Sequence, residues 1–317
     1  MRLAIATAAL AAFGLASIGS AAAEYPERPV RVIVPSPAGG STDVGTRILA
    51  DAIEAHLGQR WVIENRPGAG LLIGMQALAD AEPDGYTLGY THQPFLTVHI
   101  YVNEADFTFD SFEPVALLVD DPNTVAVRVD SPFESLEDLI AAMRERPGEI
   151  TFGDTGYLSD DHLVTVAIER AFGVEANAVH YDGSAPLRAA VLGGHVDVYV
   201  GNVGDTKVTY DEGQFRVLAV ATEERIDAFP NTPTFRELGV DLVASSARGV
   251  SFPAGTPTAY ADRMAEAIAA ASQDEDYLRR MAEQGLAVRV LTREEYGAFQ
   301  AQRMEFVRGL LEALGEL

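Results

Sequence analysis

The stretch that most constrains the fold is residues 30–57, where an apolar strand leads through a loop of small residues into a helix. Residues 30–34 (Val-Arg-Val-Ile-Val) are mostly apolar, as in a strand buried in a parallel sheet. A glycine-containing loop follows, and a helix with Thr42 or Asp43 as its expected N-cap carries apolar residues at helical spacing up to Leu57. The free N–H groups at such a helix N-terminus suit a small anion such as a carboxylate.

The loop in this stretch is not a nucleotide-binding P-loop, because no Gly-Lys-Ser or Gly-Lys-Thr follows it. A tight turn without a ligand is the alternative interpretation. The segment from Gly68 to Gly74 imitates a dinucleotide fingerprint only weakly, and we expect its glycines to allow close packing of a helix on a sheet. The sequence therefore predicts no cofactor.

Charge and the N-terminal segment limit the possible partners and location. The chain has 47 acidic and 23 basic residues and a formal net charge of −24, which makes nucleic acid and anionic membranes poor partners. Arg2, an apolar stretch and the Ala-Ala-Ala at 21–23 together resemble a secretory signal peptide over residues 1–23, with a membrane anchor as the alternative. The chain has no cysteine and thus no disulfide. We expect a soluble, monomeric mature protein in the periplasm.

Strands and helices alternate along the rest of the chain. Residues 61–64 and 86–90 continue a βαβαβ beginning, which implies a parallel sheet with helices on both faces. Two strands, 113–119 and 124–129, are expected on either side of residues 120–123 (Asp-Asp-Pro-Asn), where the chain should enter a second domain. A strand at 217–221 is the expected return. The predicted division is 24–122 plus 222–317 for domain 1, and 123–221 for domain 2.

A second strand–loop–helix motif lies in the expected second domain. A strand ends at Phe152, a small polar loop runs from Gly153 to Asp160, and a helix follows to about Phe172. Two such loops on different α/β domains, facing one another, predict a cleft whose connecting strands act as a hinge.

These motifs resemble the start and the spacing of the substrate-binding proteins of tripartite tricarboxylate transporters, the TctC or Bug family. The matching segments are 25–29 (Tyr-Pro-Glu-Arg-Pro), 32–35 (Val-Ile-Val-Pro), 39–43 (Gly-Gly-Ser-Thr-Asp), 62–70 (Val-Ile-Glu-Asn-Arg-Pro-Gly-Ala-Gly), 83–87, 181–185, 192–197 and 253–257 (Pro-Ala-Gly-Thr-Pro). The resemblance covers nearly all of the mature chain. It implies an α/β fold of the periplasmic binding protein type, a type II-like Venus flytrap with two α/β domains and a hinge.

The resemblance also implies a function: capture of a small organic acid, a di- or tricarboxylate, and its delivery to the large and small membrane subunits of a permease. The residues carried over by position as ligand contacts come from the first loop (Ser36, Pro37, Ala38, Gly40, Ser41, Thr42, Asp43), the second loop (Gly153, Asp154, Thr155, Gly156, Ser159, Asp160, His162) and further cleft edges (Gly183, Ser184, Ala185, Gly201, Asn202).

Two positions depart from the family pattern. Arg248 stands where many members carry an aromatic residue, and Asp182 stands where a lysine is common. Arginine holds a carboxylate bidentately and stays charged, so we predict that Arg248 binds a second carboxylate of the ligand. An ion pair of Arg248 with an acid at the rim is the alternative.

Three predicted contacts have structural alternatives. Asp43 is as consistent with a helix cap as with a ligand contact. His162, one turn into its helix, fits packing or a water-bridged role better than direct contact. Asp154 is unusual in an anion-binding loop, and it either points outward or binds a hydroxyl group.

Two other functional classes remain open on sequence grounds. An enzyme, such as a secreted α/β hydrolase, is disfavoured because the chain has no Gly-x-Ser-x-Gly, no His-Glu-x-x-His and no cysteine. The six histidines show no metal-ligand spacing, so we predict no metal site. A receptor that presents its ligand to a membrane sensor kinase has the same sequence features as a transport receptor.

Overall fold

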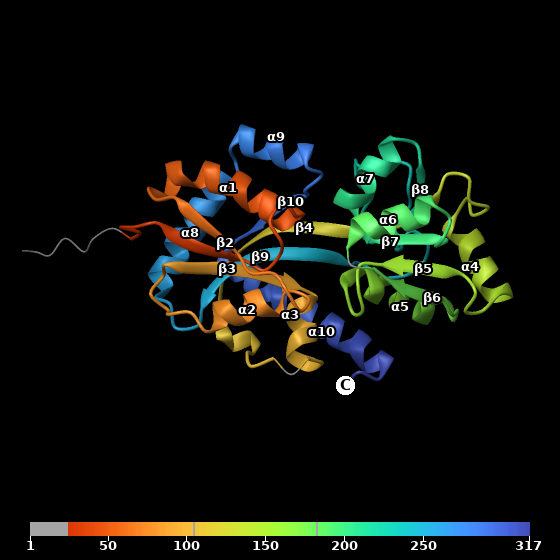
Figure 1. Ribbon diagram of the computed structural model, residues 1–317, viewed down its shortest axis with the longest axis horizontal. Coiled ribbons are helices and arrows are strands. Elements are labelled where there is room, and N and C mark those ends of the chain that lie inside the picture. Colours follow the sequence, from red (N-terminus) through yellow and green to blue (C-terminus); the bar gives the residue numbers. More distant parts are fainter. Residues whose placement is uncertain (1–24, 104, 182) are drawn as a thin grey trace, which may run out of the picture.

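The structure, a computed structural model, describes residues 25–103, 105–181 and 183–317. The predicted signal peptide at 1–23 and the departure at Asp182 lie outside these residues. Figure 1 shows two lobes side by side, connected by two long strands, β4 (Phe112–Arg128) and β9 (Ser245–Pro253). In the described part of the chain no helix has the length and apolar character needed to cross a membrane.

The first lobe is built on a mixed sheet in the order β2–β1–β3–β9–β4. Its other strands and its helices are β1 (Val30–Val34), β2 (Trp61–Asn65), β3 (Thr87–Gln93), β10 (Val288–Leu291), α1 (Ser41–Leu57), α2 (Leu72–Ala79), α3 (Phe95–Tyr101), a 3-10 turn (Phe109–Ser111), α8 (Thr258–Ala271), α9 (Glu275–Glu283) and α10 (Arg293–Leu314). The predicted βαβαβ beginning is confirmed, because β1 pairs in parallel with β2 and β3. The sheet is not wholly parallel, since β9 joins β3 and β4 in antiparallel pairing.

The second lobe repeats this plan around the other half of β4. Its elements are α4 (Leu136–Glu145), β5 (Thr151–Asp154), α5 (Asp160–Phe172), β6 (Asn177–His180), α6 (Ser184–Leu192), β7 (Val198–Asn202), α7 (Val203–Asp211) and β8 (Phe215–Val220). β5 pairs in parallel with β6 and β7, whereas β4 runs antiparallel to β7 and β8. In each lobe the parallel strands therefore end at the same edge of the sheet, and the helices that follow them begin there.

The connection through β4 differs from the prediction of two separate strands. β4 is one strand of 17 residues, and its residues 120–122 are paired with residues 245–247 of β9. The composition Asp-Asp-Pro-Asn is typical of a turn, but here Asp121 is buried and accepts a hydrogen bond from the Gly204 N–H at 3.2 Å. The pairing with β9 and the hydrogen bond from Gly204 keep this segment extended.

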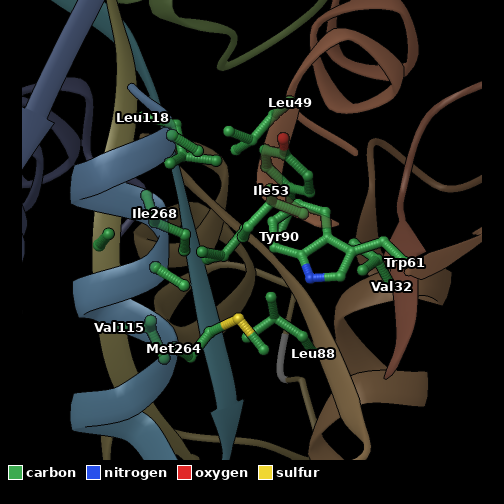
Figure 2. Packing of buried hydrophobic residues seen from close by; sticks show 14 of the residues in the cluster. Val32, Leu49, Ile53, Trp61, Leu88, Tyr90, Val115, Leu118, Met264 and Ile268 are labelled. Atoms are coloured by element: carbon green, nitrogen blue, oxygen red, sulfur yellow. The ribbon is translucent and has the colours of Figure 1, made fainter. Parts of the chain in front are cut away.

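Each lobe has its own apolar core. In the first lobe, side chains of α1 and α8 meet the sheet around Trp61 and Tyr90, as Figure 2 shows. In the second lobe, Phe152 and Val198 lie in a core that also contains Phe235 and Leu242. The chain from 222 to 244 thus packs with the second lobe, although the expected return was at 217–221. We propose that the domain boundary lies near residue 245, where β9 begins.

The C-terminal helix α10 contacts both lobes. Near its start, the Tyr296 hydroxyl donates to the Thr91 carbonyl of β3 at 3.0 Å. Near its end, Leu310 and Leu311 pack with Leu158 and Leu163 beside the start of α5. Figure 1 shows α10 below the connecting strands. The lobes are therefore joined by a helix as well as by the strands β4 and β9.

Candidate ligand-binding site

The first loop presents backbone rather than side chains. α1 begins at Ser41 with Gly40 as its N-cap in an extended conformation, so the prediction of Thr42 or Asp43 as N-cap is wrong by two or three residues. The cause is a turn in which the Gly40 N–H donates to the Pro37 carbonyl at 3.2 Å and positions Gly40 ahead of the helix. Within the described chain, the N–H groups of residues 41–43 have no hydrogen-bond acceptor.

Asp43 braces this loop from inside. Its carboxylate accepts hydrogen bonds from Arg47 at 2.9 and 3.0 Å, from the Asn65 amide at 3.0 Å and from the Gly39 N–H at 2.8 Å. Burial favours the protonated acid, but these hydrogen bonds prevail and hold the pKa of Asp43 below its usual value. Because the carboxylate is fully engaged, Asp43 could offer a ligand only its backbone N–H.

The other predicted residues of the first loop differ in exposure. Pro37, Ala38 and Ser41 are exposed, whereas Thr42 is buried. The hydroxyl of Ser36 is buried and has no hydrogen-bond partner in the described residues. An anion approaching the start of α1 would thus meet exposed backbone first.

The second loop is organised by buried side chains. Ser159 is the N-cap of α5, and its hydroxyl accepts the His162 N–H at 3.2 Å. Asp154 is fully buried, and it binds the His180 Nδ1 at 2.8 Å and the Gly156 N–H at 2.9 Å. Asp154 therefore does not point outward, which was one of the two alternatives expected for it. Burial raises the pKa of Asp154, and the two hydrogen bonds oppose the change.

His162 has a defined tautomer. Its Nδ1 accepts the Leu158 N–H at 3.0 Å, so the ring proton of the neutral form lies on Nε2. Burial, with a smaller effect from nearby His180, lowers the pKa of His162 to about 4. At neutral pH His162 therefore offers one N–H donor through Nε2, which suits a carboxylate oxygen.

Asp154, His162 and His180 together have the composition of a metal site. One candidate ligand atom from each lies within 4.8 Å of the others, an arrangement that the sequence spacing did not predict. The hydrogen bond from Leu158 disfavours a metal at His162 Nε2, because a metal-bound imidazole carries its proton on the other nitrogen and donates it. The hydrogen bond at His162 thus argues against a metal ion held by all three residues.

A buried polar network closes the back of the second loop. The Asn123 amide nitrogen donates to Asp160 at 2.9 Å and to Asp161 at 2.8 Å, and the Asn202 amide donates to Asp160 at 2.8 Å. The Thr155 hydroxyl reaches Asp161 at 2.5 Å. Burial and the neighbouring Asp160 raise the pKa of Asp161 well above its usual value. Asn123 and Asp161 are part of the site but were not predicted.

Arg248 lies on β9, beside His92 of β3 and Val119 of β4. It is 6% exposed, and its Nη2 lies 3.7 Å from Asp121, so the pair is buried rather than at the rim. Its Nη1 is buried and has no partner among the described residues. Arg248 also lines a small hollow together with residues that include Ser41 and Thr42 of α1.

The remaining predicted residues lie at the ends of second-lobe strands and helices. Gly183 precedes α6 with φ +106°, and Ser184 and Ala185 form the first turn of that helix. Asn202 ends β7, and the carbonyl of the preceding Gly201 accepts the Thr124 hydroxyl at 2.9 Å.

No hydrogen bond joins the two loops directly within the described residues. They are connected instead through the hinge. Arg248 borders α1 and faces Asp121, the Asp121 carbonyl accepts the Asn202 amide at 3.1 Å, and Asn202 bonds Asp160. The structure thus links both loops to the strands that connect the lobes.

Known proteins are similar to this chain in sequence and in fold. The family model for the tripartite tricarboxylate transporter family receptor, TctC, matches residues 46–315. Protein BugT of Bordetella pertussis is 32% identical over 303 residues, which cover 92% of this chain and 90% of BugT.

Two solved structures from Rhodopseudomonas palustris are also similar. One, solved with adipate, has a TM-score of 0.81 at 28% identity and covers 92% of this chain and 99% of its own. The other is MatC with bound malate, with a TM-score of 0.78 at 25% identity over 90% of this chain and all (100%) of its own. The family model and the similar solved structures indicate the same family of solute-binding proteins. The chain therefore belongs to the tripartite tricarboxylate transporter receptor (TctC) family and has the fold of the periplasmic binding proteins.

Proposed function

We propose that this protein is an extracytoplasmic receptor that captures a di- or tricarboxylate between its lobes and delivers it to a tripartite permease with one large and one small membrane subunit. Membership of the receptor family supports the role, and the adipate and malate of its structural neighbours support the ligand class. Binding without catalysis, a cleaved signal peptide at residues 1–23, a periplasmic location and a monomeric state are parts of the same proposal.

The observation that carries the ligand class is the buried guanidinium of Arg248. A buried charge with one unbonded nitrogen is costly, so this group is suited to receive an anion. Ser41 and Thr42 at the start of α1 line the same hollow, and a helix N-terminus adds a partial positive charge. One ligand carboxylate would lie between Arg248, Ser41 and Thr42.

A second carboxylate would lie at the second loop. His162 offers its Nε2 proton there, and the first turn of α5 adds backbone donors close by. The other predicted cleft residues keep their proposed roles, apart from the carboxylates of Asp43, Asp154 and Asp160, which already accept hydrogen bonds from the protein. Contacts from both lobes to one ligand would favour a closed state of the hinge.

A thermal-shift screen followed by calorimetry tests the proposal. The panel contains adipate, malate and citrate, with acetate as the single-carboxylate control. A ligand present at a hundred times its Kd should stabilise the folded protein by about 2.7 kcal/mol. If none of the three binds, or if acetate binds as tightly as they do, the proposal of a multi-carboxylate receptor is wrong.

Variants of Arg248 make the test specific. We expect Arg248→Ala to weaken binding of the best ligand by roughly 2–5 kcal/mol, because a desolvated carboxylate loses its charged partner. Arg248→Lys should recover part of this loss, since lysine keeps the charge but not the planar fork. Arg279→Ala on the exposed surface of α9 is the control and should leave affinity unchanged. Binding by the alanine variant within about threefold of wild type would place Arg248 outside the site.

A further inference from the structure

Asp121 is the carboxylate that faces Arg248 in this structure. It lies 3.7 Å from Arg248, is 2% exposed, and its other oxygen accepts the Gly204 N–H at 3.2 Å. At 3.7 Å the ion pair is longer than a normal hydrogen bond, so Arg248 is only loosely held. The Asp121 carboxylate thus neutralises Arg248 in the ligand-free protein without filling its donor positions.

The charges around Asp121 are mostly negative. Arg248 on β9 lowers the pKa of Asp121, whereas Asp160 on α5 and Asp205 on α7 raise it. His92, beside Arg248 on β3, stays neutral because burial and the arginine lower its pKa to about 3. Burial dominates and raises the pKa of Asp121 to about 7. The ionised form of Asp121 therefore depends on Arg248.

We propose that Asp121 is an internal counter-ion which a ligand carboxylate displaces from Arg248, and that Asp121 then takes up a proton from solvent. The inference rests on the proposed function, because it requires the ligand to bind Arg248. It assigns to Asp121 an affinity-determining role that neither the sequence nor the family comparison gives it.

The physical reason is the charge balance of the closed cleft. A bound carboxylate adds one negative charge beside Arg248 and removes water from its surroundings. Asp121 would then be a buried carboxylate that shares its only facing cation, among the groups named above, with the ligand. Such a charge is more costly to keep than the protonated acid, so the proton-bound form prevails.

The affinity for the ligand should depend on pH through Asp121. Binding raises the pKa of Asp121 above its ligand-free value of about 7, so the complex holds more protons than the free receptor at higher pH. Affinity should therefore fall as the pH rises above about 7, by up to tenfold per pH unit. Below that range Asp121 is protonated in both states, and affinity no longer depends on it.

Calorimetry in buffers of different ionisation enthalpy measures the protons exchanged. Adipate, with malate as a second probe, is titrated into the protein at about pH 8 in phosphate and in Tris; both ligands are fully ionised there and bring no proton. We expect wild type to take up close to one proton per ligand. Asp121→Asn should take up none and should bind adipate at least as tightly, because its Arg248 has no internal anion.

A matched control lies next to Asp121 on the same strand. Asp120 is also largely buried and pairs with Arg289 at 2.5 Å, but it points to the opposite face of β4. Asp120→Asn should keep the proton uptake of wild type. Thermal unfolding of each variant checks that it is folded, and the wild-type buffer comparison decides the question even if Asp121→Asn does not fold.

The outcomes separate the two proposals. Adipate or malate binding without proton uptake by wild type would overturn the counter-ion inference and leave the proposed function standing. Uptake that persists in folded Asp121→Asn would assign the proton to another group, such as Asp161, and would also overturn it. If neither probe binds wild type, the proposed function fails and the inference fails with it.

Discussion

The two predicted ligand-binding loops, which precede α1 and α5, have the same sequence pattern, but different contacts hold them in place. In the first loop one carboxylate, Asp43, is braced by the half-exposed Arg47, and the helix start is bare backbone. In the second loop Asp154, Asp160 and Asp161 are all buried and bonded to side chains from other strands. The same strand–loop–helix motif thus has backbone N–H groups without a side-chain cap in the first loop, and donors surrounded by buried carboxyl groups in the second.

The largest expected difference is between two asparagines that brace the loops. Asn123→Ala removes the donor shared by Asp160 and Asp161, and we expect a loss of roughly 2–4 kcal/mol in the free energy of unfolding. Asn65→Ala removes bonds to Asp43 and the Ser36 carbonyl, but Asp43 keeps Arg47, so the loss should be about 1 kcal/mol. Urea unfolding at pH 7 measures both, and equal losses would contradict the comparison.

A smaller difference is expected at the two serines that precede or begin the helices. Ser159→Ala removes the side-chain cap of α5 and should cost about 1 kcal/mol of stability. Ser41→Ala should change stability by less than about 0.5 kcal/mol, because α1 has no side-chain cap. Urea unfolding without ligand is the measurement. A loss at Ser41 as large as at Ser159 would mean that the first loop also depends on its side chain.

The smallest expected effect concerns pH and His162. The folded protein keeps His162 neutral down to about pH 4, whereas the unfolded chain protonates it near its ordinary pKa of 6.5, so protonation favours unfolding. Stability is thus lost as the pH falls from about 6.5 toward 4. At pH 6 this should amount to under about 1 kcal/mol.

Unfolding curves of wild type and His162→Gln at pH 7.5 and pH 6 isolate this contribution. The variant should lose less stability than wild type over that interval, since glutamine does not titrate. His56→Gln, a substitution on the exposed surface of α1, is the control and should retain the wild-type change. If His162→Gln and wild type lose the same amount, His162 is not held neutral by the fold.

Local patterns were enough to predict many of the strands and helices and both strand–loop–helix motifs, although β4 was divided in two and β10 was missed. The alternating valines of β1 and the glycines after it determine a strand and a turn through neighbouring residues alone. The same patterns, taken together along the chain, were specific enough to indicate the family and its fold, which the comparisons confirm.

The side-chain chemistry of the site was less predictable, because its partners are distant in sequence. Asp121 meets a backbone N–H 83 positions away, and this contact keeps extended a segment whose composition indicated a turn. Asn123 lies in the segment predicted to separate two strands, and no local pattern indicates its contacts with Asp160 and Asp161, 37 and 38 positions away. His180 meets Asp154 only because the fold pairs β6 with β5, and its neighbours in sequence give no sign of that contact.

The pairing of β4 with β9 has a consequence for engineering. The chain enters and leaves the second lobe through adjacent strands, with residue 122 opposite residue 245. The second lobe is therefore a cassette with neighbouring attachment points, which a short linker could replace or which could be exchanged between related receptors. The end of α10 would need redesign in either case, because Leu310 and Leu311 would lose the apolar surface that they cover.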